Sequence, residues 1–461
     1  MYSKFLLLLT CLLSACNVFA NTPKYIFYFI GDGMGLSPIM VTEAYNRTVL
    51  NNKEHLQMLQ FPVISLATSY SANQHITDSS AAGTALSTGY KTKNYMLGMN
   101  PDSVAVYSVA KSLKEAGYGV GIATTVTLND ATPGAFYGHA VNRNNYYDIA
   151  LGILDTNYDI LAGYTLLGNK NKDKDTGLYD TIEKAGYKIV KGKDEYNKIK
   201  NHDKIVLLNK PNKYGHCGYT VDSTGNENFN VPYLTQTCID HLQKNSPDKF
   251  FMMIEGGNID WLGHSNDPGM IKSILDFDEG VKIAYNFYKQ HPDETLILVT
   301  ADHNTGGMTF GVNGNKLVTL KNLDYQKISI SEFQYYCKKL LESGKKTEWN
   351  EMKEFISMNL GLYGAIKVDE NDDKAIKESF DNTFNKKDTE NVETLYLTYS
   401  SFTSEVFKVF CKYTGIGWTT TGHTGDFTPV YAIGVGAEEF SGLNNNIDLP
   451  KKLAKITGVK F

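Results

Sequence analysis

Five short apolar runs, each of the length of a buried strand, set the pattern of this 461-residue chain. They are Tyr25 to Ile30, Gly119 to Thr124, Phe250 to Ile254, Thr295 to Val299 and Val430 to Val435. Helical patterns such as Val104 to Ala116 and Met270 to Lys289 lie between them. This alternation predicts an α/β fold with a central, mostly parallel sheet flanked by helices on both faces. Ligands bind such folds beyond the carboxyl ends of the strands, so the residues after each run are candidates for chemistry.

Two segments interrupt the alternation of strands and helices. Residues near 165–235 are rich in Asn, Lys, Asp, Gly and Tyr, which predicts a loop-rich insertion. Residues 305–418 predict an inserted helical cap, because they contain the amphipathic stretches Ser331 to Ser343 and Glu351 to Asn359. The core domain would then comprise residues 22–304 and 419–461.

The N-terminus has the pattern of an export signal, predicted to cover residues 1–20. Lys4 precedes the apolar run Phe5 to Leu13, which is too short to span a bilayer but has the length of a signal-peptide core. Two cleavage patterns compete. Val18-Phe19-Ala20 fits ordinary cleavage and gives a soluble product, whereas Leu13-Ser14-Ala15-Cys16 resembles a lipobox, whose cysteine would carry a lipid anchor. We therefore expect a periplasmic or extracellular protein, either soluble or lipid-anchored, without a transmembrane helix.

Charge and cysteine content narrow the class of protein. The formal net charge of −5, with no stretch dense in Lys and Arg, argues against a nucleic-acid-binding module. Cys217, Cys238, Cys337 and Cys411 follow the leader, and in an oxidising compartment they can form two disulfides. The pairing of Cys217 with Cys238 is the more local one. None of them forms a Cys-x-x-Cys pair, so a cysteine zinc site is not expected.

Carboxylates and histidines follow several of the apolar runs. Asp32 lies in the loop Gly31 to Gly35, which fails the dinucleotide-binding fingerprint because Leu36 stands at the third glycine position. Taken alone, Asp32 fits a turn residue equally well. Glu255, Asp260 and His264 follow the third run, and Asp260 and His264 are spaced to point the same way from a helix.

Further ligand-type residues lie later in the chain. Asp302 and His303 follow the fourth run, and His423 precedes the fifth. Carboxylates mixed with imidazoles suit Zn²⁺, whereas carboxylate and hydroxyl oxygens suit Mg²⁺. The sequence therefore predicts two kinds of metal environment.

Ser79 is the candidate nucleophile, within the stretch Thr77 to Ala85. An acid and hydroxyls before an Ala-rich stretch also fit an ordinary helix N-terminus. The two interpretations share one physical basis, since the unpaired N–H groups of a helix N-terminus favour an anion. Arg143 is the candidate phosphate ligand, because the planar guanidinium group of arginine can donate two parallel hydrogen bonds to phosphate oxygens.

Taken together, these residues resemble the alkaline phosphatase family from Asp32 to His423. The matching motifs are Asp32-Gly33-Met34-Gly35, Thr77-Asp78-Ser79 with Thr84-Ala85 and Ser87-Thr88-Gly89, Asp130-Ala131-Thr132-Pro133, the Glu255, Asp260 and His264 spacing, Thr300-Ala301-Asp302-His303, and Gly422-His423-Thr424-Gly425. The resemblance implies hydrolysis of small phosphate monoesters through a phosphoserine intermediate, for phosphate scavenging. It also implies two zinc ions and one magnesium ion. Relatives often form homodimers, so a homodimer is a further expectation.

The resemblance also implies a role for each matching residue. One zinc would be bound by Asp32, Asp302 and His303. The second zinc would be bound by Asp260, His264 and His423. The magnesium would be bound by Asp32, Thr132 and Glu255. Ser79 would be the nucleophile and Arg143 the phosphate clamp, with Asp78 orienting the arginine. We also expect Asp130 and Trp261 to lie around these residues.

The chain departs from the family pattern in ways that affect the expected chemistry. Trp261 stands where some relatives carry a Lys or His that contacts phosphate through water, and Ser80 replaces the usual alanine. Only the spacing to Thr84 and Gly89 selects Ser79 over Ser80. Rival interpretations are a metal phosphodiesterase of the same superfamily and a non-catalytic exported protein that binds metal or phosphate. A sulfatase is disfavoured, because the Cys/Ser-x-Pro-x-Arg pattern is not found around Ser79.

Overall fold

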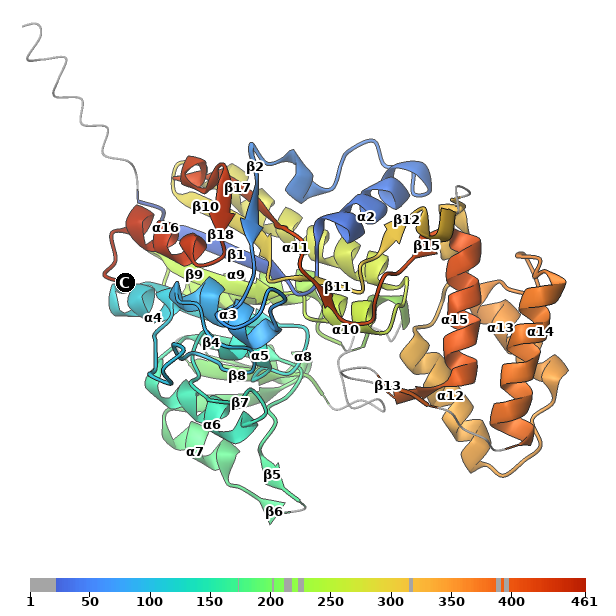
Figure 1. The fold of residues 1–461 in the computed structure, drawn as a ribbon. Helices are drawn as coiled ribbons and strands as arrows, with labels where there is room; N and C mark the ends of the chain where they lie inside the picture. The colour runs from blue at the N-terminus through green and yellow to red at the C-terminus, as the bar shows by residue number, and fades with distance from the viewer. Residues whose placement is uncertain are drawn as a thin grey trace, which may run out of the picture.

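A ten-stranded sheet forms the centre of the protein (Figure 1). The computed structural model describes residues 22–461 apart from 173, 201–202, 211–217, 223–227, 315–317, 387–390 and 394–397. The strands of the sheet are β1 (Tyr25–Gly31), β2 (Val63–Thr68), β3 (Gly119–Thr124), β4 (Ile160–Gly163), β7 (Tyr187–Lys191), β8 (Lys204–Leu208), β9 (Phe250–Glu255), β10 (Thr295–Ala301), β17 (Thr428–Gly434) and β18 (Leu443–Asn445). Their order is β18-β2-β17-β10-β1-β9-β3-β4-β8-β7. Only β17 among these ten runs antiparallel to its neighbours, so the predicted mostly parallel sheet is confirmed.

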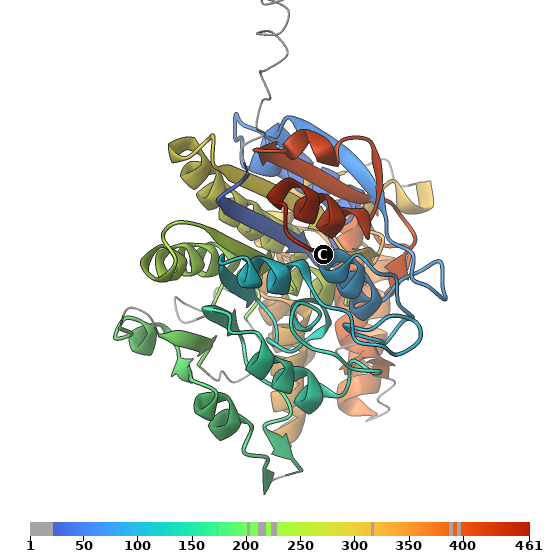
Figure 2. The same ribbon diagram turned by 90° about the vertical axis from the view of Figure 1, so that its left-hand side faces the viewer.

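Helices cover both faces of the sheet, as Figures 1 and 2 show together. The α-helices are α2 (Leu36–Thr48), α3 (Ser79–Thr88), α4 (Val109–Glu115), α5 (Ala131–Gly134), α6 (Tyr146–Leu151), α7 (Leu178–Lys184), α8 (Lys193–Tyr196), α9 (Val231–Asn245), α10 (Asn258–His264), α11 (Met270–Gln290), α12 (Ile330–Glu342), α13 (Trp349–Leu360), α14 (Glu370–Phe380), α15 (Ser401–Thr414) and α16 (Asp448–Thr457). Successive side chains of β1 point to opposite faces of the sheet. Phe27 and Phe29 pack in the cluster that includes Phe277 of α11, whereas Tyr28 packs in the cluster that includes Leu86 of α3.

The five predicted strands are β1, β3, β9, β10 and β17. The helix predicted from Val104 begins later, because the Ser108 side chain accepts a hydrogen bond from Lys111 N and caps α4 at Val109. The segment near 165–235, predicted as a loop-rich insertion, also supplies β7 and β8 to the sheet edge. It is therefore partly core, because Ile205, Val206 and Leu207 are fully buried.

The predicted helical cap is confirmed, with α12 to α15 on the right in Figure 1. Two short strand pairs close its base: β11 (Asn304–Thr305) with β16 (His423–Thr424), and β12 (Thr309–Phe310) with β15 (Ile416–Gly417). Apolar cap residues such as Phe333 and Phe402 belong to the same buried cluster as Phe277 of α11. The cap therefore shares its core with one face of the sheet.

The disulfide prediction is wrong for the described cysteines. Cys238, Cys337 and Cys411 are free and buried, and Cys217 lies outside the described residues. Cys238 on α9 is fully buried in the same apolar cluster as Ile160 of β4, where burial raises the pKa of its thiol to about 12. It acts as a packing residue. The predicted signal peptide and Cys16 also lie outside the described residues, and no helix in the described part of the chain is long and apolar enough to cross a membrane.

Candidate active site

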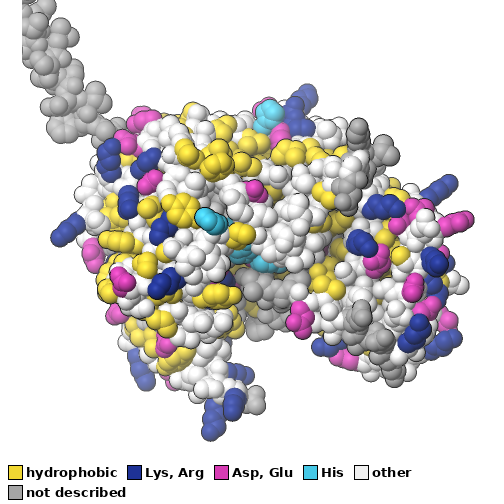
Figure 3. All heavy atoms as spheres, viewed as in Figure 1, with side chains coloured by type: hydrophobic (Ala, Val, Ile, Leu, Met, Phe, Trp, Pro, Cys, Tyr) yellow, Lys and Arg dark blue, Asp and Glu magenta, His cyan; other side chains and the backbone are white. Residues whose placement is uncertain are grey.

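The sheet topology brings the ligand-type residues together at one edge. Glu255 ends β9, Asp32 follows β1, and Asp302 follows β10. These three strands are parallel neighbours in register, with Ile30 of β1 opposite both Glu255 and Thr300. Carboxyl ends of parallel strands meet at the same edge, so residues far apart in sequence converge there. Figure 3 shows histidine side chains at the surface near the middle of the molecule.

The first group of ligand-type residues, here called the Asp32 group, consists of Asp32, Asp302 and His303, whose candidate ligand atoms all lie within 4.8 Å of one another. His303 Nε2 lies 3.4 Å from Asp32 Oδ1 and 3.0 Å from Asp302 Oδ2. The backbone N–H groups of Gly33 and His303 donate to Asp302 Oδ1 at 3.0 and 2.8 Å. They fix that carboxylate, so its Oδ2 atom faces the imidazole.

The second group, here called the Asp260 group, consists of Asp260, His264 and His423. Its candidate ligand atoms also lie within 4.8 Å of one another. The two imidazole Nε2 atoms lie 3.1 Å apart. Their Nδ1 atoms contact backbone carbonyls, His264 with Thr421 O at 2.6 Å and His423 with Thr77 O at 2.8 Å. A protonated Nδ1 that donates to a carbonyl leaves Nε2 free to bind a metal.

The electrostatics of both groups fit divalent cations. Asp32 Oδ1, Asp260 Oδ2 and Asp302 Oδ2 are buried and accept no hydrogen bond from the residues that the structure describes. Burial, reinforced by the charge of Asp302, raises the pKa of Asp32 well above its ordinary value. Burial opposes ionisation of Asp260 too, but His264, His423 and His303 together hold its pKa below the ordinary value. Buried carboxylate oxygens without donors, beside imidazole nitrogens, form the donor set that zinc prefers.

The residues expected at the magnesium site lie next to the Asp32 group. Thr132 Oγ1 of α5 lies 3.5 Å from Asp32 Oδ2. Glu255 is 1% exposed, and the hydroxyl of Thr124 donates to its Oε2 atom. Burial raises the pKa of Glu255 to about 8, with the charges of Asp130 and Asp302 adding to the effect. Two carboxylates and a hydroxyl supply the hard oxygen ligands that magnesium prefers.

Ser79 is the first residue of α3 and is 1% exposed. Its Oγ lies 3.1 Å from His303 Nε2, beside the Asp32 group. The hydroxyl of Ser80 instead donates to Asp78 Oδ2 at 2.6 Å, so the side chain of Ser80 is bound to the helix cap. The geometry therefore distinguishes the two serines that the sequence could separate only by spacing.

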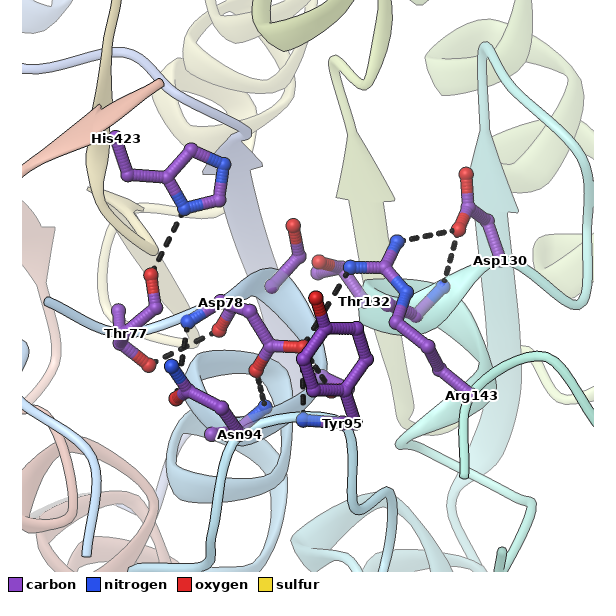
Figure 4. Close-up of polar contacts among 12 residues, drawn as sticks. Thr77, Asp78, Asn94, Tyr95, Asp130, Thr132, Arg143 and His423 are labelled. Atoms are coloured by element: carbon purple, nitrogen blue, oxygen red, sulfur yellow. Dashed lines mark hydrogen bonds and ion pairs between the residues drawn. The ribbon is translucent and has the colours of Figure 1, made fainter. Parts of the chain in front are cut away.

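Arg143 lies beside the start of α3, held by two carboxylates (Figure 4). Its Nη2 donates to Asp130 Oδ1 at 2.9 Å, and its Nη1 lies 3.8 Å from Asp78 Oδ2. Asp78 also accepts from Ala81 N as the N-cap of α3. One carboxylate thus links the helix that carries Ser79 to the guanidinium. Trp261 follows Asp260 on α10 and packs against the apolar cluster on the α11 face. Its expected place around Ser79 and Arg143 stays a prediction.

Three residues of the site carried no assigned role in the sequence interpretation. The hydroxyl of Thr305 donates to Asp260 Oδ1 and contacts His303 Nδ1 at 3.1 Å, so it bridges the two groups. Asn94 Oδ1 accepts from Asp78 N at 3.2 Å. Tyr95 follows, with its own N–H donating to Asp78 Oδ2. Their sequence signal was weak, because each acts through a partner that is distant in sequence or through its backbone.

Comparison with known proteins identifies the family. The family model described as alkaline phosphatase matches residues 23–162 and 162–459. The chain belongs to the alkaline phosphatase family. It is 30% identical to alkaline phosphatase 4 of Bacillus subtilis and 31% identical to alkaline phosphatase 3 of the same organism, each match covering 94% of this chain and 88% of the relative.

Solved alkaline phosphatases share the fold. The cold-active alkaline phosphatase from a psychrophilic Shewanella species has a TM-score of 0.76 and 26% identity, with 94% of this chain and 99% of that chain covered. A variant of the alkaline phosphatase from TAB5, solved with magnesium in its M3 site, has a TM-score of 0.64 and 25% identity over 96% and 100% of the two chains. The protein is thus an alkaline phosphatase, an enzyme that acts on phosphate esters.

Proposed function

We propose that this alkaline phosphatase hydrolyses phosphate monoesters through a phosphoserine intermediate on Ser79. The observation that carries the proposal is the position of the Ser79 hydroxyl, 3.1 Å from His303 Nε2 at a helix N-terminus. Arg143 is held nearby by Asp78 and Asp130. A protein that only sequesters metal or phosphate needs no buried serine hydroxyl beside its ligands.

We further propose two zinc ions, held by the Asp32 and Asp260 groups, and one magnesium ion held by Asp32, Thr132 and Glu255. When bound, these ions supply positive charge that activates an attacking oxygen and offsets the charge that develops on the leaving oxygen. The donor chemistry supports the assignment, because imidazole occurs in both zinc groups and only oxygen atoms occur in the third set. Magnesium in the TAB5 relative's M3 site supports the third position.

The residues of this chain then have separate tasks. Ser79 Oγ attacks phosphorus in line, the phosphorus–oxygen ester bond breaks, and the alcohol leaves with a proton. Water next attacks the phosphoserine, which restores the serine hydroxyl and releases inorganic phosphate. Arg143 binds two phosphate oxygens throughout, while Asp130 and Asp78 hold its guanidinium in place. Most of the rate enhancement comes from positioning and charge neutralisation.

Hydrolysis of p-nitrophenyl phosphate and bis-p-nitrophenyl phosphate by the metal-loaded full chain tests the proposal. We expect the monoester to be preferred, and Ser79→Ala to lose at least about a thousandfold in kcat/KM. Ser80→Ala is the matched control and should stay within about tenfold of wild type, because Ser80 only donates to the helix cap. Preference for the diester would instead indicate a phosphodiesterase. Full activity in Ser79→Ala would overturn the nucleophile assignment.

We also propose that the protein is exported and serves phosphate scavenging. The support is the leader pattern of residues 1–20, with Cys16 and Ala20 marking the two competing cleavage sites. Cell fractionation of wild type and Cys16→Ser separates the cases. A lipid-anchored protein moves from the membrane to the soluble fraction in Cys16→Ser, whereas a conventionally cleaved protein is soluble in both. Retention of the full leader in the cytoplasm would refute export.

A further inference from the structure

Tyr95 has a backbone conformation that ordinarily favours glycine. Its φ is +71°, in the left-handed region that bulky residues rarely adopt. The backbone is held there from both sides: Tyr95 N donates to Asp78 Oδ2 at 2.9 Å, and Tyr95 O accepts from Arg143 N at 2.8 Å. Tyr95 thus connects the N-cap of the Ser79 helix to the residue proposed to clamp phosphate.

Neither of these backbone bonds explains why the residue is a tyrosine. Glycine has the same N–H and C=O groups and adopts this φ without steric strain. Packing does not explain it either, because Tyr95 is 54% exposed. A strained, exposed aromatic residue at an active site requires some other advantage, and strain of this kind concentrates at functional sites.

The exposed ring of Tyr95 lies among the residues of the candidate active site. In Figure 4 it rises from the backbone beside the carboxylate of Asp78 and the guanidinium of Arg143, the group proposed to bind phosphate. Ile76 is 46% exposed close by, and its carbonyl accepts from Asn94 Nδ2 at 3.0 Å. Exposed apolar side chains therefore lie next to the charged groups of Asp78 and Arg143.

We infer that the Tyr95 ring is a contact surface for the alcohol part of the substrate, and that it favours monoesters whose alcohol is a flat aromatic ring. This inference rests on the proposed monoesterase function of the same site. Stacking of a planar ligand on an aromatic side chain contributes about fivefold or more in affinity. A small aliphatic alcohol offers no flat face and gains little from the contact.

Two measurements test the inference, with Tyr95→Gly, Tyr95→Phe and the control Tyr90→Ala. Tyr90 is 55% exposed and follows the opposite end of α3. The first measurement compares kcat/KM for p-nitrophenyl phosphate with kcat/KM for glycerol 2-phosphate. The second is calorimetric binding of phenylphosphonate and methylphosphonate, which carry no ester bond to hydrolyse and therefore report recognition without turnover.

We expect Tyr95→Gly to lower the aryl-to-alkyl ratio about fivefold in both measurements, while Tyr95→Phe and Tyr90→Ala keep the wild-type ratio. Equal losses for aryl and alkyl ligands in Tyr95→Gly would overturn the inference, because they would indicate a role only in placing Asp78 and Arg143. A loss in Tyr95→Phe as large as in Tyr95→Gly would also overturn it, since the hydroxyl would then be the active group. If wild type hydrolyses neither ester, the proposed function fails, and the phosphonate comparison still decides the role of the ring.

Discussion

Removing the proposed metal ions should make the stability of this protein depend strongly on pH through Glu255. This side chain ends β9 and is 1% exposed, and burial raises its pKa to about 8, with Asp130 and Asp302 contributing. The folded-state pKa thus lies above the ordinary value of 4.5. A group of this kind contributes stability that is fully present below about pH 4.5 and is lost as the pH rises through about 8.

The size of the effect follows from the two pKa values. The difference between 4.5 and about 8 corresponds to at most about 5 kcal/mol of unfolding free energy. Glu255→Gln removes the ionisation while keeping most of the shape and an oxygen that can accept from the Thr124 hydroxyl. The metal-free variant should therefore lose less stability than metal-free wild type as the pH rises.

Urea unfolding of the chelator-treated full chain at pH 5 and pH 9 measures this difference. We expect wild type to lose several kcal/mol more than Glu255→Gln between these conditions, and added magnesium to restore wild type more than the variant. Glu279→Gln is the matched control, because the Glu279 side chain is 59% exposed. Equal pH dependence in wild type and Glu255→Gln would refute the reasoning. So would an equal flattening in Glu279→Gln.

Three further changes test other contacts of the protein. Arg143→Lys should raise the inhibition constant for inorganic phosphate about tenfold or more, because lysine lacks the fork that binds Asp130 and phosphate together. Burial raises the pKa of Asp222 to about 7, despite hydrogen bonds from Ser329, so the wild type loses stability as the pH rises from 4 to 7. Asp222→Asn should therefore make the free energy of unfolding in urea depend less on pH over this range. Cys238→Ala should lower stability by about 1 kcal/mol equally with and without a reducing agent, because Cys238 is a free packing residue. A reductant effect on wild type alone would indicate a disulfide.

The centre of the sheet could be predicted from sequence because its strands are buried on both faces. Each of β1, β3, β9 and β10 is a nearly continuous apolar run, a pattern that needs no knowledge of its neighbours. The convergence of Asp32, Glu255 and Asp302 followed from the rule that parallel strands end at one edge. These positions were therefore accessible from local patterns and one topological rule.

The sheet edge and the cysteines could not be predicted in the same way. β7 (Tyr187–Lys191) mixes buried and exposed residues, with Lys188 and Lys191 pointing to solvent, so it reads as a polar connection. Whether Cys238 pairs with another cysteine depends on where its side chain points in three dimensions. It packs inside the apolar cluster beneath α9, which no spacing between cysteines reveals.

The place of His423 shows how a long insertion and a compact site coexist. His303 and His423 flank residues 304–422, yet their rings stack with centroids 3.6 Å apart. The β11–β16 pair explains this, because Thr305 lies opposite His423 in the ladder. The Thr305 hydroxyl in turn contacts His303 and Asp260, so one residue at the base of the cap positions side chains of both groups. Changes within the cap helices should therefore be tolerated by the chemistry as long as this strand pair is kept, whereas changes at Thr305 should disturb both groups together.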